Sequence, residues 1–212
     1  MTSSRRYTAD TRLRSLLGAR LDHFHRIGAS APSARPAAVA LVVVAGQDGR
    51  AELLVTRRAA RLRVNSGQWA LPGGGLEPGE DASSGARREL REELGLDLAA
   101  SSVLGMLDDY VTRSGYLITP VVLWGGPTSV LAPASAEVAA IHRVGLVELD
   151  AEGSRRLLRI PESDRPVLQL RLASLGTVHA PTAAFLYQFR QVLLRHRTTR
   201  VAQYDQPVFA WR

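Results

Sequence analysis

Residues 74–96 read GGLEPGEDASSGARRELREELGL, the most informative pattern in the chain. Its first half contains glycines and a proline, which disfavour a regular helix or strand, so we expect a loop there. Its second half predicts a helix that opens at Asp81 or Ser83, runs to about Leu94 and stops at Gly95. The stretch therefore predicts a glycine-rich loop followed by a charged helix.

The acidic residues of this helix lie on one side of it. Glu89, Glu92 and Glu93 occupy positions i, i+3 and i+4, which share a face of an α-helix. The opposite face carries the apolar residues Ala86, Leu90 and Leu94. Because three like charges repel one another, the cluster needs compensation, and a divalent cation with oxygen ligands provides it. The alternative, an acidic face in solvent, does not explain the glycines of the loop.

Two more charged residues belong to the same pattern. Arg88 adjoins the acidic cluster and can hold a carboxylate through a bidentate contact. Glu80 lies in the loop, free to reach back over the helix. The loop glycines let the backbone approach a ligand closely. The segment thus combines a helix face suited to a metal ion with a loop whose backbone can approach a ligand closely.

This segment resembles the Nudix box, G-x5-E-x7-R-E-U-x-E-E-x-G-U, where U is aliphatic. Every fixed position is present, from Gly74 to Leu96. The resemblance implies an α/β fold, a Nudix-type α/β/α sandwich with a mixed sheet, in which the box forms a loop–helix–loop catalytic motif. It also implies hydrolysis of a nucleoside diphosphate linked to another group, with Mg²⁺ or Mn²⁺ as the cofactor.

The resemblance implies a role for each matching residue. Glu80 and Arg88 would orient the acids. The implied metal ligands are the side chains of Glu89, Glu92 and Glu93 and the backbone carbonyl of Gly73, the residue just before the box. The residue that activates water stays open between Glu92, Glu93 and an acid outside the box. Glu137 is the candidate outside acid, and an ordinary surface glutamate is the alternative for it.

The residues upstream of the box are similar to the signature of the coenzyme A-hydrolysing Nudix subgroup. They are LVTRRA at 54–59, Arg63, Gly67 and LPGG at 71–74, where Leu71 departs from the commoner phenylalanine. The similarity implies cleavage of coenzyme A or acyl-coenzyme A into 3′,5′-ADP and 4′-phosphopantetheine. Coenzyme A carries a 3′-phosphate in addition to its diphosphate, and arginine side chains are well suited to bind such a phosphate. The predicted substrate-binding residues are Arg57, Arg58, Arg63 and Gly74, and Arg61 belongs to the same basic cluster.

Composition excludes several other chemistries. The 212-residue chain has no cysteine, and all 27 of its basic residues are arginine. Disulfides, thiolate nucleophiles, Schiff bases and the lysine of a Walker A loop are therefore excluded. The net charge of +7 does not predict a nucleic-acid partner, because the arginines are spread along the chain. A small nucleotide substrate is the expected partner.

We expect three segments in the chain. Residues 1–34 form an N-terminal helical extension and linker, 35–150 a Nudix core domain, and 151–212 a C-terminal extension whose helix packs on the core. The extensions supply either a homodimer interface or a substrate lid, a choice that stays open. The longest apolar run, 37–45, is too short to span a bilayer, and no signal sequence is evident. We therefore expect no membrane contact and a cytoplasmic location.

Local patterns predict the remaining elements. We expect disorder over 1–9, a helical piece over 155–160 and an extended C-terminal stretch over 201–212. The other expected helices cover about 10–25 and, as an amphipathic helix, 183–195. The expected strands cover 37–45 and 51–57, joined as a hairpin, then 68–71, 103–113, 116–125 and part of 134–147.

Two other functions remain open from the sequence. A Nudix hydrolase could instead act on ADP-ribose, a dinucleotide or a nucleoside triphosphate. A chain of this fold could also be a ligand-binding module without turnover. The complete set of acids disfavours the second alternative, because a protein that only binds does not need them.

Overall fold

The computed structural model describes residues 7–59, 67–127, 131 and 133–211. The helices are α1 (Thr11–Asp22), α2 (Ala82–Leu94), α3 (Leu146–Leu149) and α4 (Thr182–Phe189), which continues as π-helical turns over Arg190–Leu194. Short 3-10 segments cover Ala100–Ser102 and Val208–Trp211. The strands are β1 (Arg35–Ala45), β2 (Ala51–Arg58), β3 (Trp69–Ala70), β4 (Gly73–Gly75), β5 (Val103–Met106), β6 (Tyr110–Val111), β7 (Tyr116–Pro127), β8 (Val138–Gly145), β9 (Arg155–Ile160), β10 (Ser163–Leu172) and β11 (Gly176–His179).

One mixed sheet forms the centre of the fold. In the described part of the chain it has eight strands. Five follow the order β3-β2-β1-β7-β5, and in addition β4 pairs with β1, β6 with β7 and β8 with β2. Strand β1 pairs parallel with β7 and antiparallel with β2 and β4. The expected hairpin of β1 and β2 is therefore confirmed, and so is the expected mixed sheet.

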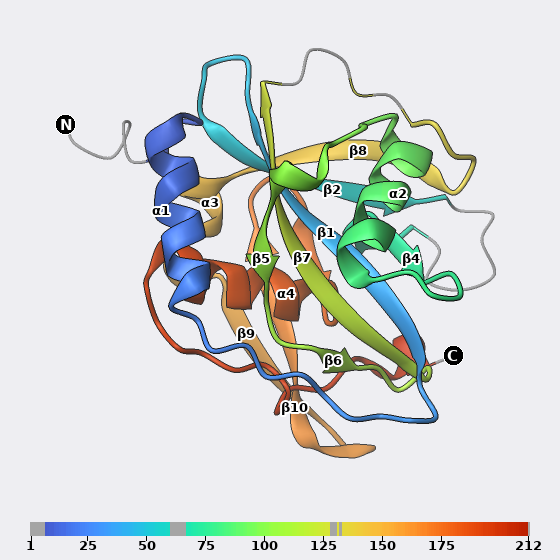
Figure 1. The fold of residues 1–212 in the computed structure, drawn as a ribbon. Helices are drawn as coiled ribbons and strands as arrows, with labels where there is room; N and C mark the ends of the chain where they lie inside the picture. The colour runs from blue at the N-terminus through green and yellow to red at the C-terminus, as the bar shows by residue number, and fades with distance from the viewer. Residues whose placement is uncertain (1–6, 60–66, 128–130, 132, 212) are drawn as a thin grey trace.

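Helices cover both faces of this sheet. Side chains of β1 alternate between two hydrophobic clusters, because successive residues of a strand point to opposite faces. Leu41 and Val43 pack with residues of α1 and α4, whereas Val42 and Val44 pack with Leu90 of α2. Figure 1 shows α1 and α2 on opposite sides of the sheet. Burial on both faces explains why the sequence of β1 is continuously apolar rather than alternating.

The N-terminal extension packs on the core. Asp10 caps α1 by accepting a hydrogen bond from the backbone N–H of Leu13 at 2.8 Å, and Leu17 and Leu21 are buried on the same side. The expectation of disorder over 1–9 is wrong for the residues described there. Tyr7 is buried, and the backbone of Thr8 forms a bridge with Arg50. This pairing is far apart in sequence, so local composition does not reveal it.

The C-terminal extension differs most from expectation. Residues 155–160 form strand β9, not a helix, and β9 pairs with β10 in a second sheet of order β11-β10-β9. The expected 183–195 helix exists as α4 with its π-helical continuation, but it is buried on all sides. It contacts β10 and β11 and also joins the hydrophobic cluster of the main sheet, so it has no solvent-exposed face, and even its polar residues Gln188 and Gln191 are buried. Each helix in the described ranges is too short or too polar to cross a bilayer.

Ion pairs attach the chain's end to the core. Asp205 accepts hydrogen bonds from Arg113 Nη2 at 2.6 Å and from Ser163 Oγ at 2.7 Å. Burial alone would raise the pKa of Asp205, but the hydrogen bonds from Arg113, Ser163 and the Gln206 N–H lower it below its usual value. The stretch expected to be extended ends in the 3-10 segment Val208–Trp211, where Trp211 Nε1 donates to the Gln206 carbonyl at 2.9 Å and the Arg113 guanidinium lies over the Trp211 ring.

Candidate active site

The loop and helix of residues 74–96 form the predicted loop–helix pair. Asp81 caps α2 by accepting a hydrogen bond from the Ser84 N–H at 2.8 Å. Gly95 ends the helix in the left-handed conformation at φ 67°, as expected of glycine at this position. The start of the loop is more regular than expected, since Gly73–Gly75 pair with β1 as strand β4.

Two glycines bring this strand close to its neighbours. Gly73 has φ 156°, and a Cβ atom on it would lie 2.7 Å from Val39 Cα. A Cβ atom on Gly74 would lie 2.8 Å from Glu89 Cδ, and closer still to its Oε1. A Cβ atom on Gly75 would have more room, because its nearest neighbour would be the Pro36 carbonyl oxygen at 4.0 Å. Gly73 and Gly74 therefore allow the backbone of β4 to lie directly against the acidic face of α2.

Arg88 connects the loop to the acids of the helix. Its Nε and Nη2 each donate to Glu80 at 3.0 Å, a bidentate pair, and Nη2 also donates to the Gly75 carbonyl at 3.0 Å. Its Nη1 donates to Glu89 Oε1 at 2.8 Å and to Glu92 Oε2 at 3.1 Å. These bonds lower the pKa of Glu80 and raise the pKa of Arg88 itself. Arg88 is thus placed to orient three carboxylates.

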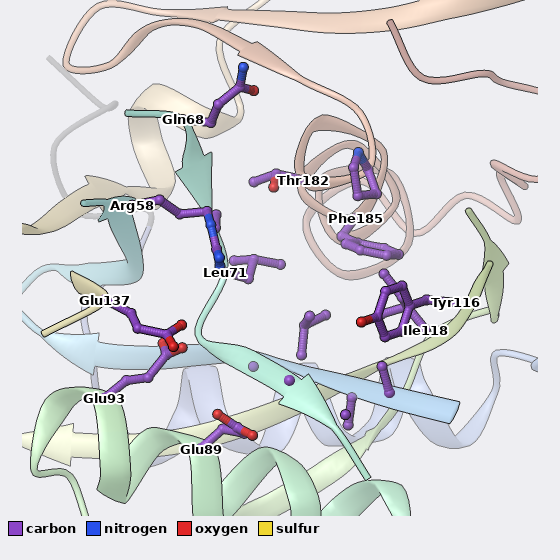
Figure 2. Close-up of a pocket in the computed structure, with 18 of the residues that line it drawn as sticks. Arg58, Gln68, Leu71, Glu89, Glu93, Tyr116, Ile118, Glu137, Thr182 and Phe185 are labelled. Carbon is purple, nitrogen blue, oxygen red and sulfur yellow. The ribbon is translucent and has the colours of Figure 1, made fainter. Parts of the chain in front are cut away.

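Glu89, Glu93 and Glu137 form what we call the acidic end of a cavity. Figure 2 shows the carboxylates of Glu93 and Glu137 facing one another, with Glu89 beside them. Glu93 Oε2 is buried, with no hydrogen-bond partner among the described residues. Burial, together with the negative charges of Glu89 and Glu137, raises the pKa of Glu93 to about 8. Burial likewise raises the pKa of Glu89, although Arg88 opposes the effect.

The acids are not arranged as a complete metal cage. Within the described ranges, no three Asp, Glu or His side chains form a group that could hold a metal ion as they stand. Glu92 is the most exposed of the helix acids that contact Arg88, with 52% of its side-chain surface exposed. The three glutamates share one face of α2 as predicted, and they line one cavity, but Arg88 holds two of them. Bringing them onto one ion would require Glu89 or Glu92 to reorient.

The cavity extends well beyond the acids. Its volume is about 910 Å³, and residues of α2, β1, β4, β7, β11 and α4 line it. Across the cavity from the acids lie Tyr116, Ile118 and Phe185, which with the neighbouring lining residue Pro181 we call the aromatic end. Figure 2 shows Tyr116, Ile118 and Phe185 grouped together there. The cavity therefore lies between the sheet and the C-terminal extension.

The predicted substrate-binding residues are only partly brought together. Arg58 and Gly74 line the cavity, and Figure 2 shows Arg58 extending from β2 toward Glu93 and Glu137. The Nε atom of Arg58 is buried without a hydrogen-bond partner in the described structure. Arg57 is not among the lining residues; its Nε donates to the Gly67 carbonyl at 3.3 Å and its guanidinium lies over Trp69. Arg63 and Arg61 fall outside the described residues.

Sequence reasoning did not identify the C-terminal side of the cavity. Thr182 and Phe185 of α4 and His179 of β11 line it, although they lie far from the box in sequence. Arg35 lies over the Tyr116 ring, with 4.1 Å from Cζ to the centroid. None of these residues belongs to a local motif. The antiparallel pairing of β10 with β11, which precedes α4, places His179 and Thr182, whereas the pairing of β1 with β7 places Arg35 beside Tyr116.

Comparison with known proteins identifies the family. Residues 34–170 match the family model described as the NUDIX domain. Because this match covers more than half of the chain, the chain belongs to the Nudix family.

Its curated relatives carry the same family name. The chain is 39% identical over 115 residues to the uncharacterized Nudix hydrolase NudL of Photorhabdus laumondii, a match that covers 54% of this chain and 60% of that protein. It is 33% identical over 123 residues to Nudix hydrolase 3 of Caenorhabditis elegans, covering 56% of this chain and 50% of the relative. The chain thus spans half to somewhat more than half the length of these relatives.

Solved structures support the fold. A MutT/nudix family protein from Enterococcus faecalis superposes with a TM-score of 0.55 at 14% identity, covering 80% of this chain and 67% of that chain. The Nudix hydrolase RenU of M. smegmatis superposes with a TM-score of 0.51 at 20% identity, covering 82% of this chain and 91% of that chain. These likenesses confirm the expected α/β fold with a mixed sheet.

Proposed function

We propose that this chain is a divalent-cation-dependent hydrolase of a nucleoside diphosphate linked to another group. The substrate that we propose is coenzyme A or an acyl-coenzyme A, giving 3′,5′-ADP and 4′-phosphopantetheine. The observation that carries the proposal is the buried, unpaired Oε2 of Glu93, which lines the same cavity as Glu89 and Glu137. A carboxylate oxygen without a hydrogen-bond partner is costly to bury unless a cation or a proton compensates it.

The residues present fit a hard divalent cation. Glu89, Glu92 and Glu93, with the Gly73 carbonyl, would hold Mg²⁺ or Mn²⁺, because these ions prefer oxygen ligands. When bound, the ion would neutralise charge on the diphosphate and increase the acidity of a water molecule. Arg88 would keep Glu89 available to this site from its anchor on Glu80.

The chain's own residues account for the rest of the reaction. Water forms the new bond to phosphorus while the anhydride P–O bond breaks, and the proton of that water passes to a carboxylate. Glu93 and Glu137 face one another and remain the candidates for this base, along with Glu92. Arg58, a cavity-lining cation beside these acids, would contact a phosphate oxygen of the substrate.

The assignment of coenzyme A follows from the signature upstream of the box. Two arginines of this signature, Arg57 and Arg58, belong to the described residues, and of these two Arg58 lines the cavity. The division at residues 34 and 150, the cytoplasmic location and the homodimer stay predictions. ADP-ribose, dinucleotides and nucleoside triphosphates are the alternative substrates, and a ligand-binding module without turnover is the alternative function.

A substrate panel tests the proposal. Coenzyme A, dephospho-coenzyme A, ADP-ribose and a dinucleotide are incubated with the whole chain and Mg²⁺ or Mn²⁺, and the products are identified by mass. We expect coenzyme A to have the highest kcat/KM. Equal cleavage of dephospho-coenzyme A would contradict a 3′-phosphate contact. Absence of products from every substrate would favour the ligand-binding module.

A variant pair tests the site. Glu93→Gln removes the charge of the central carboxylate, and we expect at least about a hundredfold loss of kcat with an unchanged thermal midpoint, because preorganised acids contribute about 10²–10⁴-fold to such reactions. Glu152→Gln, an exposed glutamate outside the cavity, is the matched control and should retain full activity. Undiminished turnover by Glu93→Gln would exclude the proposed site.

A further inference from the structure

Two arginines among the described residues line the cavity, and they lie at different ends of it. Arg58 extends toward Glu93 and Glu137 at the acidic end (Figure 2). Arg35 lies at the aromatic end, where its Cζ atom is 4.1 Å from the centroid of the Tyr116 ring. The proposed hydrolysis uses the acids and Arg58, and it gives Arg35 no role.

No acid of the described structure neutralises the charge of Arg35. A guanidinium has five N–H groups, and in Arg35 the Nη2 group donates to the Ser114 carbonyl in a long hydrogen bond of 3.5 Å. The neighbouring Arg113 differs, because its Nη2 donates to Asp205 at 2.6 Å in an ion pair. Contact with the face of the Tyr116 ring restrains the Arg35 guanidinium and leaves the N–H groups at its edge able to donate to an anion.

The other polar groups of this end do not supply a second positive charge. Burial lowers the pKa of His179, so its ring is neutral near pH 7, and its Nδ1 lies 3.0 Å from Gln169 Nε2. Thr182 Oγ1 donates to the Trp69 carbonyl at 3.1 Å. Among the residues described at this end, Arg35 is therefore the cation that an anionic part of a ligand can meet.

The strand register separates Arg35 from the acidic end. Gly73 pairs with Val39, which lies four residues beyond Arg35 on β1. Since a strand rises about 3.3 Å per residue, Arg35 lies about 13 Å along β1 from the Gly73 carbonyl that would hold the cation. Because the screening length is about 10 Å at 0.1 M salt, an anionic group beside Arg35 would experience little repulsion from the acids.

We propose that Arg35 binds the 3′-phosphate of the substrate and thereby selects coenzyme A over nucleotides that lack this group. This inference rests on the proposed function, and it assigns the additional phosphate to the start of β1 and not to the arginines of the upstream signature. Of those that the structure describes, Arg57 does not line the cavity and Arg58 lies beside the acids. In coenzyme A the ribose alone separates the 3′-phosphate from the diphosphate, so one molecule would meet the acidic end and the Arg35 side chain together.

Adenosine 3′,5′-bisphosphate and adenosine 5′-monophosphate form a suitable probe pair. They differ only in the 3′-phosphate, and neither contains the anhydride that the enzyme would cleave. Their dissociation constants for the whole chain are measured by calorimetry with Mg²⁺ present. We expect the bisphosphate to bind about 5- to 30-fold more tightly, less than a buried charged hydrogen bond would give, because Arg35 is exposed. This preference should shrink at about 1 M salt, where the screening length falls to about 3 Å.

Variants locate the contact. Arg35→Gln removes the charge, and it should remove most of the preference for the bisphosphate while binding of the monophosphate stays unchanged. Arg35→Lys keeps the charge but not the planar set of donors, so it should retain part of the preference. Arg12→Gln removes the same charge from an exposed position of α1 outside the cavity, and it should behave as wild type. Because Arg35 is exposed, its variants should fold, which circular dichroism checks.

The outcomes separate this inference from the proposed function. If the bisphosphate binds no more tightly than the monophosphate, or if Arg35→Gln keeps the preference, the inference is wrong. If Arg35→Gln weakens both nucleotides equally, Arg35 shapes the site without recognising the 3′-phosphate, and the inference is also wrong. Neither result bears on whether the chain hydrolyses a diphosphate, which the substrate panel decides. A preference lost in Arg35→Gln supports the inference even if no substrate of the panel is cleaved.

Discussion

Replacing Gly74 by alanine is expected to disable the acidic end while the protein stays folded. The added Cβ would lie 2.8 Å from Glu89 Cδ, whereas ordinary contacts begin at 3.4 Å. The carboxylate must therefore move by at least about 0.6 Å, away from an Arg88 Nη1 that now lies 2.8 Å from its Oε1. A displacement of about 1 Å in a catalytic group costs about a hundredfold in rate. We expect kcat/KM to fall by about that factor.

The same change should lower the free energy of unfolding by no more than the value of one lost hydrogen bond. Loss of one charge-assisted hydrogen bond corresponds to about 1.5–3 kcal/mol, and the flexible Glu89 side chain can avoid the new methyl group. Urea unfolding followed by circular dichroism measures this free energy, and steady-state hydrolysis measures the rate.

Gly75→Ala is the matched control for the same strand. Its Cβ would meet nothing closer than the Pro36 carbonyl oxygen at 4.0 Å, so activity and stability should stay near those of the wild type. If Gly74→Ala were as active as Gly75→Ala, the placement of Glu89 against β4 would not matter for catalysis and the reasoning would be refuted.

Two further predictions concern stability. Because the folded-state pKa of Asp205 lies below its unfolded value of about 3.9, its contribution is present above that pH and is lost as the pH falls through the folded value. Wild type should therefore lose more stability between pH 5 and 2 than Asp205→Asn in urea unfolding, and parallel curves would contradict this. Gly95→Ala places alanine in a left-handed cap and should cost about 1–2 kcal/mol. Gly18→Ala, inside α1 with open space around it, should instead stabilise by about 0.5–1 kcal/mol, and equal thermal midpoints for the two variants would exclude the explanation.

The local elements of the site could be read from the amino-acid sequence. A capped helix with acids at i, i+3 and i+4 and a left-handed glycine at its end depends on neighbouring residues, so spacing alone predicted α2 and the common face of Glu89, Glu92 and Glu93. The apolar run of β1 was likewise sufficient to predict a buried strand.

The second sheet, the burial of α4 and the C-terminal side of the cavity depend on pairing between distant segments, which no local pattern in the sequence predicts. Residues 155–160 became a strand because β10 pairs with them, and the helix that follows β11 is buried on every side because two sheets enclose it. The same packing brings Phe185 to Tyr116 across the cavity from Glu93. Residue spacing was enough to predict which acidic side chains share one face of α2. The residues opposite them could not be predicted in this way, because contacts between distant segments depend on how complete elements pack and not on the residues next to each position.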